Sequence, residues 1–294
     1  MKKIIFIAGL SHSGSTILDM ALGSHPSIVG LGEIINLINA KLEDFQTDEF
    51  NRIRCSCGGD MNTCNFWKDA KKILIEDKTD ILINKYTKLV DYFSNRYGNE
   101  IILVDSSKNI SNYLTLLNKK FDFRVIFLIR DCRGWCYSRH SRYGTNMVRL
   151  AYTWLKGNLK IKRFLKKKNI LFKQFGYEEI ALYPEIMLNE ICKFAGLKFD
   201  PLMLEPDKTK SHIIRGNVVR EDSKKRKVLM YDARWFPSIQ LSIFVPLLLP
   251  ALIWNSKNVY TNFIKGTSKA FGVHQKDYII FGDAQKEKIR QHIE

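Results

Sequence analysis

Short, almost uniformly apolar runs alternate along the chain with longer stretches in which apolar residues recur every three or four positions. Runs of the first kind predict buried strands, and stretches of the second kind predict amphipathic helices. The predicted strands are Lys3–Ala8, Ile101–Val104, Arg124–Ile129 and Ile170–Phe175. The predicted helices are Ser15–Ser24, Asp69–Asp77, Asp80–Arg96, Arg133–Arg142, Met147–Lys168 and Pro184–Ala195. This alternation predicts an α/β fold in three layers, with a central parallel sheet flanked by helices.

A loop with the spacing of a phosphate-binding loop follows the first predicted strand. Residues Gly9 to Thr16 match the pattern G-x-x-x-x-G-K-[ST], except that Ser15 stands where the lysine is expected. In nucleoside triphosphatases that lysine contacts the β- and γ-phosphates. Without it, the backbone N–H groups and the following helix N-terminus still bind an anion. We therefore predict a P-loop-like site for a nucleotide anion other than ATP, formed by Ser11, His12, Ser13, Gly14, Ser15 and Thr16.

Two further polar motifs follow predicted strands. Asp105–Lys108 comes directly after Val104, and Arg130 follows the next strand, with Ser138 eight residues later in a predicted helix. An arginine can bind a phosphate through two hydrogen bonds, and a serine hydroxyl adds a neutral donor. Because ligands of parallel sheets bind beyond the carboxyl ends of the strands, the three motifs should converge on one edge.

These motifs, in this order, resemble those of the sulfotransferases that use 3′-phosphoadenosine-5′-phosphosulfate (PAPS), in particular the bacterial and tyrosylprotein branch. The loop at Ser11–Thr16 resembles their 5′-phosphosulfate loop, and Arg130 with Ser138 resembles their 3′-phosphate site. His25-Pro26, Gly32-Glu33, Asp105–Lys108, Tyr177-Glu178 and the late loop with Gly216, Asn217 and Arg220 extend the resemblance from residue 3 to about 220. It implies transfer of a sulfonate group from PAPS to an acceptor hydroxyl or amine, with adenosine 3′,5′-bisphosphate as product.

The resemblance also implies roles for individual residues. Glu33 matches the glutamate proposed as the general base, and His12 and Lys108 fall on the leaving-group side. His12 departs from the family, which usually has lysine or arginine there. An imidazole has an ordinary pKa near 6.5, so its charge depends on its surroundings. Either the donor's anionic groups keep it protonated, or it donates a neutral hydrogen bond and Lys108 supplies the charge.

Two other functions remain open at this stage. A nucleotide or small-molecule kinase with a degenerate Walker loop would need tight, Mg²⁺-dependent ATP binding, and the absent lysine argues against it. A nucleotide-binding module without turnover would keep the fold, and His12 in place of a fixed cation is compatible with it. The acceptor is also open, with saccharides, lipid-linked glycans, small alcohols and peptides as candidates. The oligomeric state is unknown.

The composition is that of a globular protein with an excess of positive charge. The chain has 294 residues, 47 Lys and Arg, 30 Asp and Glu, and a net charge of +17, which favours anionic ligands. The basic runs Lys166–Lys168 and Lys224–Lys227 accompany no recognised nucleic-acid motif, so we interpret them as solvated faces and expect no nucleic-acid partner. We expect one domain, with a cofactor-binding core over 1–222 and an extension over 223–294.

Three cysteines lie close together in a predicted insertion over residues 41–68. Cys55, Cys57 and Cys64 have a spacing that suggests zinc, but no fourth ligand is near them in sequence. We favour a packed loop near the acceptor site, with a metal or a disulfide as the alternatives. Catalysis needs no metal in principle, because the loop, Arg130 and Lys108 can balance the donor's charge.

The extension contains an almost uncharged segment over residues 239–254. It is short for a membrane span and contains two prolines, so we expect core packing or a lid, contact with a membrane surface, or an apolar acceptor groove. The apolar run after Met1 leads into the phosphate loop, and cleavage there would remove the loop. We therefore expect a cytoplasmic protein, with peripheral contact to the inner face of the membrane as a further possibility.

Overall fold

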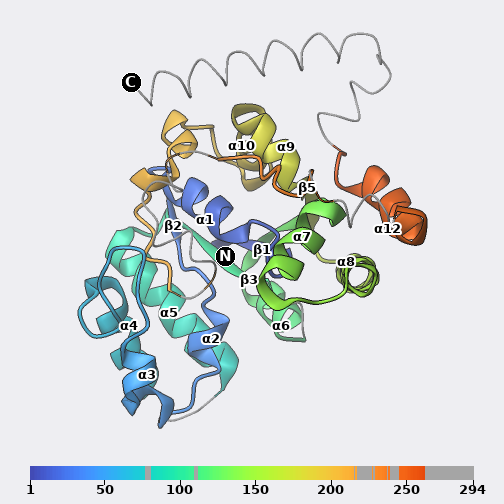
Figure 1. The fold of residues 1–294 in the computed structure, drawn as a ribbon. Helices are drawn as coiled ribbons and strands as arrows, with labels where there is room; N and C mark the ends of the chain where they lie inside the picture. Colours follow the sequence, from blue (N-terminus) through green and yellow to red (C-terminus); the bar gives the residue numbers. More distant parts are fainter. Residues whose placement is uncertain are drawn as a thin grey trace, which may run out of the picture.

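The computed structural model describes residues 1–76, 81–108, 112–214, 229–236 and 245–261, together with Gly216, Lys227 and Ser238. Its centre is a parallel five-stranded sheet in the order β2-β3-β1-β4-β5 (Figure 1). The strands are β1 (Lys3–Gly9), β2 (Ile28–Gly30), β3 (Ile102–Lys108), β4 (Asp122–Ile129) and β5 (Phe172–Gly176). The predicted α/β fold with a central parallel sheet is confirmed.

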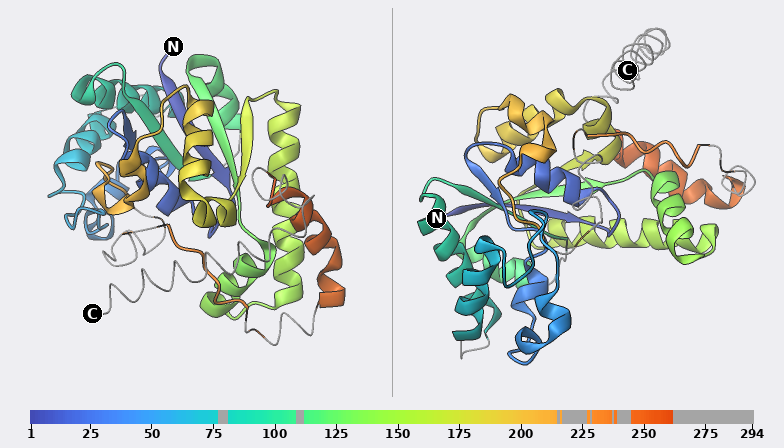
Figure 2. Two further views of the ribbon diagram at one scale, coloured as in Figure 1. Left: turned by 90° about the horizontal axis from the view of Figure 1, so that it is seen from above. Right: turned by 60° about the vertical axis from the view of Figure 1, so that its left-hand side comes forward.

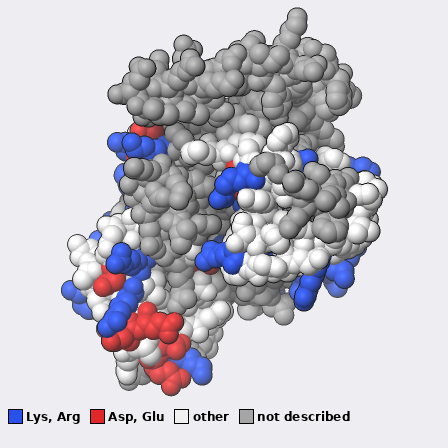
Figure 3. Space-filling model, in the orientation of Figure 1, with Lys and Arg blue, Asp and Glu red and all other residues white. Residues whose placement is uncertain are grey.

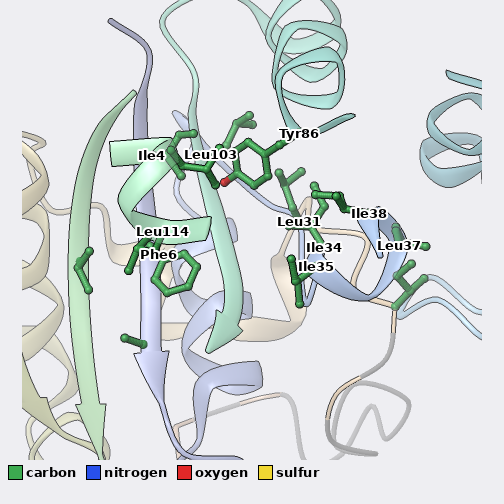
Figure 4. Packing of buried hydrophobic residues seen from close by; sticks show 14 of the residues in the cluster. Ile4, Phe6, Leu31, Ile34, Ile35, Leu37, Ile38, Tyr86, Leu103 and Leu114 are labelled. Atoms are coloured by element: carbon green, nitrogen blue, oxygen red, sulfur yellow. The ribbon is translucent and has the colours of Figure 1, made fainter. Parts of the chain in front are cut away.

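Strand β1 shows why helices cover both faces of the sheet. Its side chains alternate, so that Ile4 and Phe6 join one hydrophobic core while Ile5 and Ile7 join the other. Helices α1 (Ser15–Gly23), α9 (Tyr177–Leu182) and α10 (Pro184–Ala195) pack on the second side. The first side carries α5 (Leu82–Tyr97), α6 (Asn112–Lys120), α7 (Cys132–Tyr143) and α8 (Met147–Lys167). Figure 2 shows these layers, and Figure 4 shows Phe6 packed beside Leu114 of α6.

Four further helices are described, and two of them have only four residues each. They are α2 (Ile35–Ile38), α3 (Asp48–Asn51), α4 (Asn65–Glu76) and α12 (Val245–Asn258), with 3₁₀ turns at Asp44–Gln46, Pro201–Leu204 and Pro206–Lys208. The long predicted helices are all present, with ends that differ by a few residues. The sequence did not predict β2, α2, α3, α6 or α9, because most of these elements are too short to show a period.

One predicted boundary was wrong. The second predicted strand ended at Val104, whereas the corresponding strand of the structure, β3, continues to Lys108. The polar residues stay in the strand because their side chains are satisfied there. The buried Asp105 carboxylate accepts hydrogen bonds from the Tyr86 hydroxyl at 3.1 Å and the Ser107 N–H at 2.9 Å. The motif therefore forms the last residues of the strand rather than a loop after it.

Part of the predicted apolar segment forms α12, which packs against α8, while residues 239–244 lie outside the described residues. Leu248 and Ala251 are buried, and the Trp254 ring meets Trp154 of α8 edge-on at 5.3 Å. Leu247 and Ile253 are more than half exposed on the other side of the helix. In the described residues, no helix has the length and apolar character needed to cross a bilayer.

Charge is unevenly distributed over the described surface. On the face in Figure 3, acidic side chains gather at the end of the molecule that carries α3, where Glu43, Asp48 and Glu49 are exposed. Lys and Arg side chains are dispersed over the rest of the described part of this face. The predicted absence of a nucleic-acid partner stays a prediction.

Candidate active site

The three motifs meet at one edge of the sheet, as predicted. In the parallel register, Ala8 of β1 lies beside Lys108 of β3, and Gly9 lies beside Leu128 of β4. The loop after β1, the end of β3 and the start of α7 after Arg130 therefore share the carboxyl edge of the three central strands. This is the place where parallel α/β sheets bind their ligands.

The loop between β1 and α1 has the backbone of an anion-binding turn. His12 and Gly14 have φ angles of 69° and 90°, in the left-handed region, so successive N–H groups turn toward the inside of the loop. Gly14 is required because a Cβ there would lie 2.3 Å from the ring of Tyr177. The Ser13 hydroxyl is buried and lacks a hydrogen-bond partner in the described part of the chain. Together with the N-terminus of α1, this loop suits a bound anion.

Arg130 and Ser138 both contact the phosphate loop. The Arg130 guanidinium donates to the His12 carbonyl oxygen at 3.0 Å, and the Ser138 hydroxyl lies 3.2 Å from His12 Nδ1. The indole N–H of Trp135 donates to the Ser11 carbonyl at 2.7 Å and holds α7 against the loop. The predicted 3′-phosphate residues thus lie next to the predicted 5′-phosphosulfate loop.

Arg130 also pairs with an acidic residue that the sequence analysis missed. Its guanidinium donates to Asp232 Oδ2 at 2.5 Å, and Arg234 donates to both oxygens of Asp232 at 2.7 Å. Burial opposes ionisation of Asp232, but the hydrogen bonds from Arg234 and the charge of Arg130 lower its pKa to about 2. The Asp232 carboxylate therefore forms an ion pair with Arg130, the residue that we predicted to bind the 3′-phosphate.

Glu33 and Lys108 form an ion pair at the same edge, with side chains only 19% and 12% exposed. Two hydrogen bonds place them opposite each other. The Ser106 N–H donates to the Gly32 carbonyl at 2.9 Å, and the Ile35 N–H donates to the Ser107 hydroxyl at 3.0 Å. The base and one of the cations inferred from the resemblance are therefore in direct contact.

Gly216, with a φ of 90°, lies against both the phosphate loop and this ion pair. A Cβ at Gly216 would lie 3.0 Å from Thr16 Oγ1 and 3.3 Å from Glu33 Oε1. Gly216 of the late loop thus lies at the site. Asn217 and Arg220 lie outside the described residues.

His12 lies among positive charges. Burial first, and then the charges of Arg139, Arg142, Arg130 and Lys108, lower its pKa from 6.5 to about 4. The imidazole is therefore neutral at pH 7 when no anion is bound. Four cations around a phosphate-type loop create a positive potential that favours an anionic ligand.

The cysteine insertion gains a partner that its sequence context does not show. His212 lies next to Cys55, Cys57 and Cys64, although no fourth ligand was found near them in sequence. The signal was absent because His212 is 148 residues from Cys64. The metal site that the sequence analysis kept as an alternative therefore has four candidate ligands rather than three.

The fold and the site define an α/β protein with a phosphate-type loop that lacks the catalytic lysine of the nucleoside triphosphatases. Residues 5–201 match the profile of the sulfotransferase family, which covers more than half of the chain. The chain belongs to the sulfotransferase family, and membership implies PAPS as the sulfonate donor.

Solved structures agree with this fold. The sulfotransferase domain of the Synechococcus PCC 7002 olefin synthase is 18% identical with a TM-score of 0.52, covering 85% of this chain and 94% of that domain. The sulfotransferase domain from the curacin biosynthetic pathway is 17% identical with a TM-score of 0.54, covering 85% and 98%. A search of curated protein sequences found no significant match.

Proposed function

We propose that the phosphate loop Ser11–Thr16 binds the 5′-phosphosulfate of PAPS and that Arg130 and Ser138 bind its 3′-phosphate. The observation that supports this assignment is that both residues contact His12, one at its carbonyl oxygen and one at its ring. The Arg130 guanidinium and the Ser138 hydroxyl, two anion-binding groups of different geometry, thus both contact the same loop residue, His12. A nucleotide with anionic groups at both its 3′ and 5′ positions matches this arrangement better than a triphosphate does.

In the proposed reaction, the oxygen or nitrogen of an acceptor attacks the sulfur of PAPS. A new bond to sulfur forms as the bond between sulfur and the bridging phosphate oxygen breaks, and adenosine 3′,5′-bisphosphate leaves. Glu33 takes the acceptor's proton, while Lys108 and His12 stabilise the charge that develops on the leaving phosphate. Because Lys108 pairs with Glu33 when no donor is present, the donor would draw Lys108 toward its phosphate and free the carboxylate.

Nucleotide binding gives the direct test of this proposal. Adenosine 3′,5′-bisphosphate should bind without Mg²⁺ and at least tenfold more tightly than ATP, because the loop lacks the lysine that ATP requires. Isothermal titration calorimetry with each nucleotide, with and without Mg²⁺, measures this. Tight ATP binding that depends on Mg²⁺ would favour a kinase instead. Tight bisphosphate binding without turnover of PAPS across a panel of alcohols, phenols and amines would favour a binding module.

The protonation of His12 should depend on the donor. Negative charge on the bound nucleotide raises the pKa of His12 from its low value of about 4. Nucleotide binding should therefore be accompanied by proton uptake, and this uptake should increase as the pH of the experiment is lowered from 7 toward 4. Calorimetry in buffers of different ionisation enthalpy measures this uptake. The phosphates of the ligand titrate in the same range, and the His12→Gln variant, which keeps them, provides the baseline.

Wild-type protein should take up more protons than His12→Gln. The His12→Lys variant, with a fixed charge, should also keep its activity at alkaline pH, where the native enzyme loses it. Equal proton uptake by wild type and His12→Gln would show that His12 acts as a neutral donor and that Lys108 alone supplies the charge.

A further inference from the structure

Three thiols and an imidazole form a cluster outside the site described above. The cluster consists of Cys55, Cys57, Cys64 and His212, whose potential ligand atoms all lie within 4.8 Å of one another. His212 Nδ1 is 3.2 Å from the Cys64 sulfur and 3.7 Å from the Cys55 sulfur. All three cysteines are free thiols.

The distances of 3.2 Å and 3.7 Å from His212 Nδ1 to the two sulfurs are close to those between ligand atoms of a tetrahedral metal site. With Zn–S bonds of about 2.3 Å and Zn–N bonds of about 2.0–2.1 Å, neighbouring ligand atoms lie roughly 3.5–3.8 Å apart. A set of three thiolates and one imidazole is a common ligand set for structural zinc, and soft thiolates disfavour Mg²⁺ and Ca²⁺. Four protein ligands leave no open coordination position, so the set fits a structural rather than a catalytic ion.

The surroundings orient the ligands before any ion binds. The backbone N–H group of Trp67, in the first turn of α4, donates to the Cys64 carbonyl oxygen at 3.0 Å. The Trp67 indole donates to the His212 carbonyl, and the Phe66 ring stacks on the imidazole at 4.9 Å. Such second-shell contacts hold thiolate and imidazole ligands in place and strengthen metal binding.

The cluster also lies where two distant segments are joined. The Ser56 N–H donates to the Ile213 carbonyl at 2.9 Å, and the Ile213 N–H donates back to the Ser56 hydroxyl at 3.0 Å. Cys55 and Ile214 form an antiparallel bridge. The second segment leads directly to Gly216, which lies against Thr16 and Glu33. An ion at this junction would fix the insertion to the chain that enters the active-site loop.

We propose that Cys55, Cys57, Cys64 and His212 bind one structural Zn²⁺ ion. The ion ties the cysteine insertion to residues 211–214, and so fixes the segment that precedes Gly216 at the active site. A packed apolar loop does not account for the cluster, because Cys57 is exposed and yet its thiol lies with the other ligand atoms. The four ligands are distinct from the proposed catalytic residues, and the role proposed for the ion is structural.

The metal content of the untagged full-length protein tests this proposal. Protein purified without chelators should contain about one zinc per chain by inductively coupled plasma mass spectrometry. Cys64→Ser and His212→Ala should lose most of it, whereas His212→Cys, which restores a four-ligand set, should keep it. Cys192→Ser is the matched control, because Cys192 is a buried thiol that contacts Met203 and lies outside the cluster.

A measurement on wild type keeps the test valid if a variant does not fold. After removal of bound metal, Co²⁺ should add at one equivalent and give the visible absorption of tetrahedral cobalt with thiolate ligands. Three results would overturn the proposal: wild type that neither contains zinc nor binds Co²⁺ in this way, a disulfide between two of the three cysteines in the purified protein, or zinc content unchanged in a folded Cys64→Ser variant.

Discussion

Replacing Glu33 by glutamine should lower kcat by about 10²–10⁴ while leaving the affinity for adenosine 3′,5′-bisphosphate close to that of wild type. Glutamine keeps the size of the side chain but cannot act as a base toward the acceptor substrate. Turnover is measured as release of the bisphosphate from PAPS with an acceptor that wild type uses. Nucleotide affinity is measured by calorimetry on the same preparations.

The Glu33→Gln variant also breaks the ion pair with Lys108. Variants of Lys108 therefore separate loss of the ion pair from loss of the base. Lys108→Arg keeps a cation at this position and should retain more activity than Lys108→Met. Both variants keep the Glu33 carboxylate, so neither should show the loss of kcat that is expected when the base is removed. Glu43→Gln, at an exposed acidic residue in the predicted insertion over residues 41–68, serves as the control with native turnover. A folded Glu33→Gln enzyme with native kcat would remove Glu33 from the role of base. A variant that no longer binds nucleotide would show that Glu33 holds the site together.

Replacing Arg130 by alanine should abolish the preference for adenosine 3′,5′-bisphosphate over 5′-AMP. Loss of a charge-assisted contact to the 3′-phosphate costs about 1.5–3 kcal/mol, which is roughly a 10- to 150-fold loss of affinity for the bisphosphate. The affinity for 5′-AMP should change much less, because that nucleotide has no 3′-phosphate. Calorimetric titration of both nucleotides into both proteins measures the preference.

Asp232 supplies the companion variant to Arg130→Ala. Its carboxylate pairs with Arg130 in the described structure, so a bound 3′-phosphate would have to displace it. Asp232→Asn removes the competing charge and should strengthen bisphosphate binding while leaving 5′-AMP binding nearly unchanged. Asp207→Asn, at an exposed position, is the control. Equal affinity of wild type for the two nucleotides would contradict the assignment of Arg130.

Together, the two sets of variants address the two ends of one donor. Arg130 and Asp232 report on the 3′-phosphate, whereas Glu33 and Lys108 report on the transferred group. Because His12 contacts Ser138 and Arg130 and lies in the loop, it connects the two ends. None of these residues restricts the class of the acceptor. Activity assays should therefore start from a panel of alcohols, phenols and amines.

The sequence by itself determined the sheet, its long helices and the residues at its carboxyl edge. A buried strand followed by a glycine-containing turn and a helix is a local pattern, so the loop at Gly9–Thr16 could be recognised without any tertiary contact. Arg130 and Ser138 could be identified because their spacing of eight residues, across a strand end and the next helix, is that of the family that the sequence resembles. The sequence did not predict β2, because three residues give no periodic signal. It did not predict the continuation of β3 to Lys108, because the last residues of that strand are polar.

Only the tertiary structure decided which side chains pair across the site. Asp232 meets Arg130 at a separation of 102 residues, Glu33 meets Lys108 at 75, and His212 meets Cys64 at 148. Local sequence patterns extend over one turn or one strand, and they contain no information on which distant carboxylate, amine or imidazole will fold beside them. The motifs that we propose to bind the donor were therefore visible in the sequence, whereas the ion pairs on them and the cysteine–histidine cluster appeared only once the chain was folded.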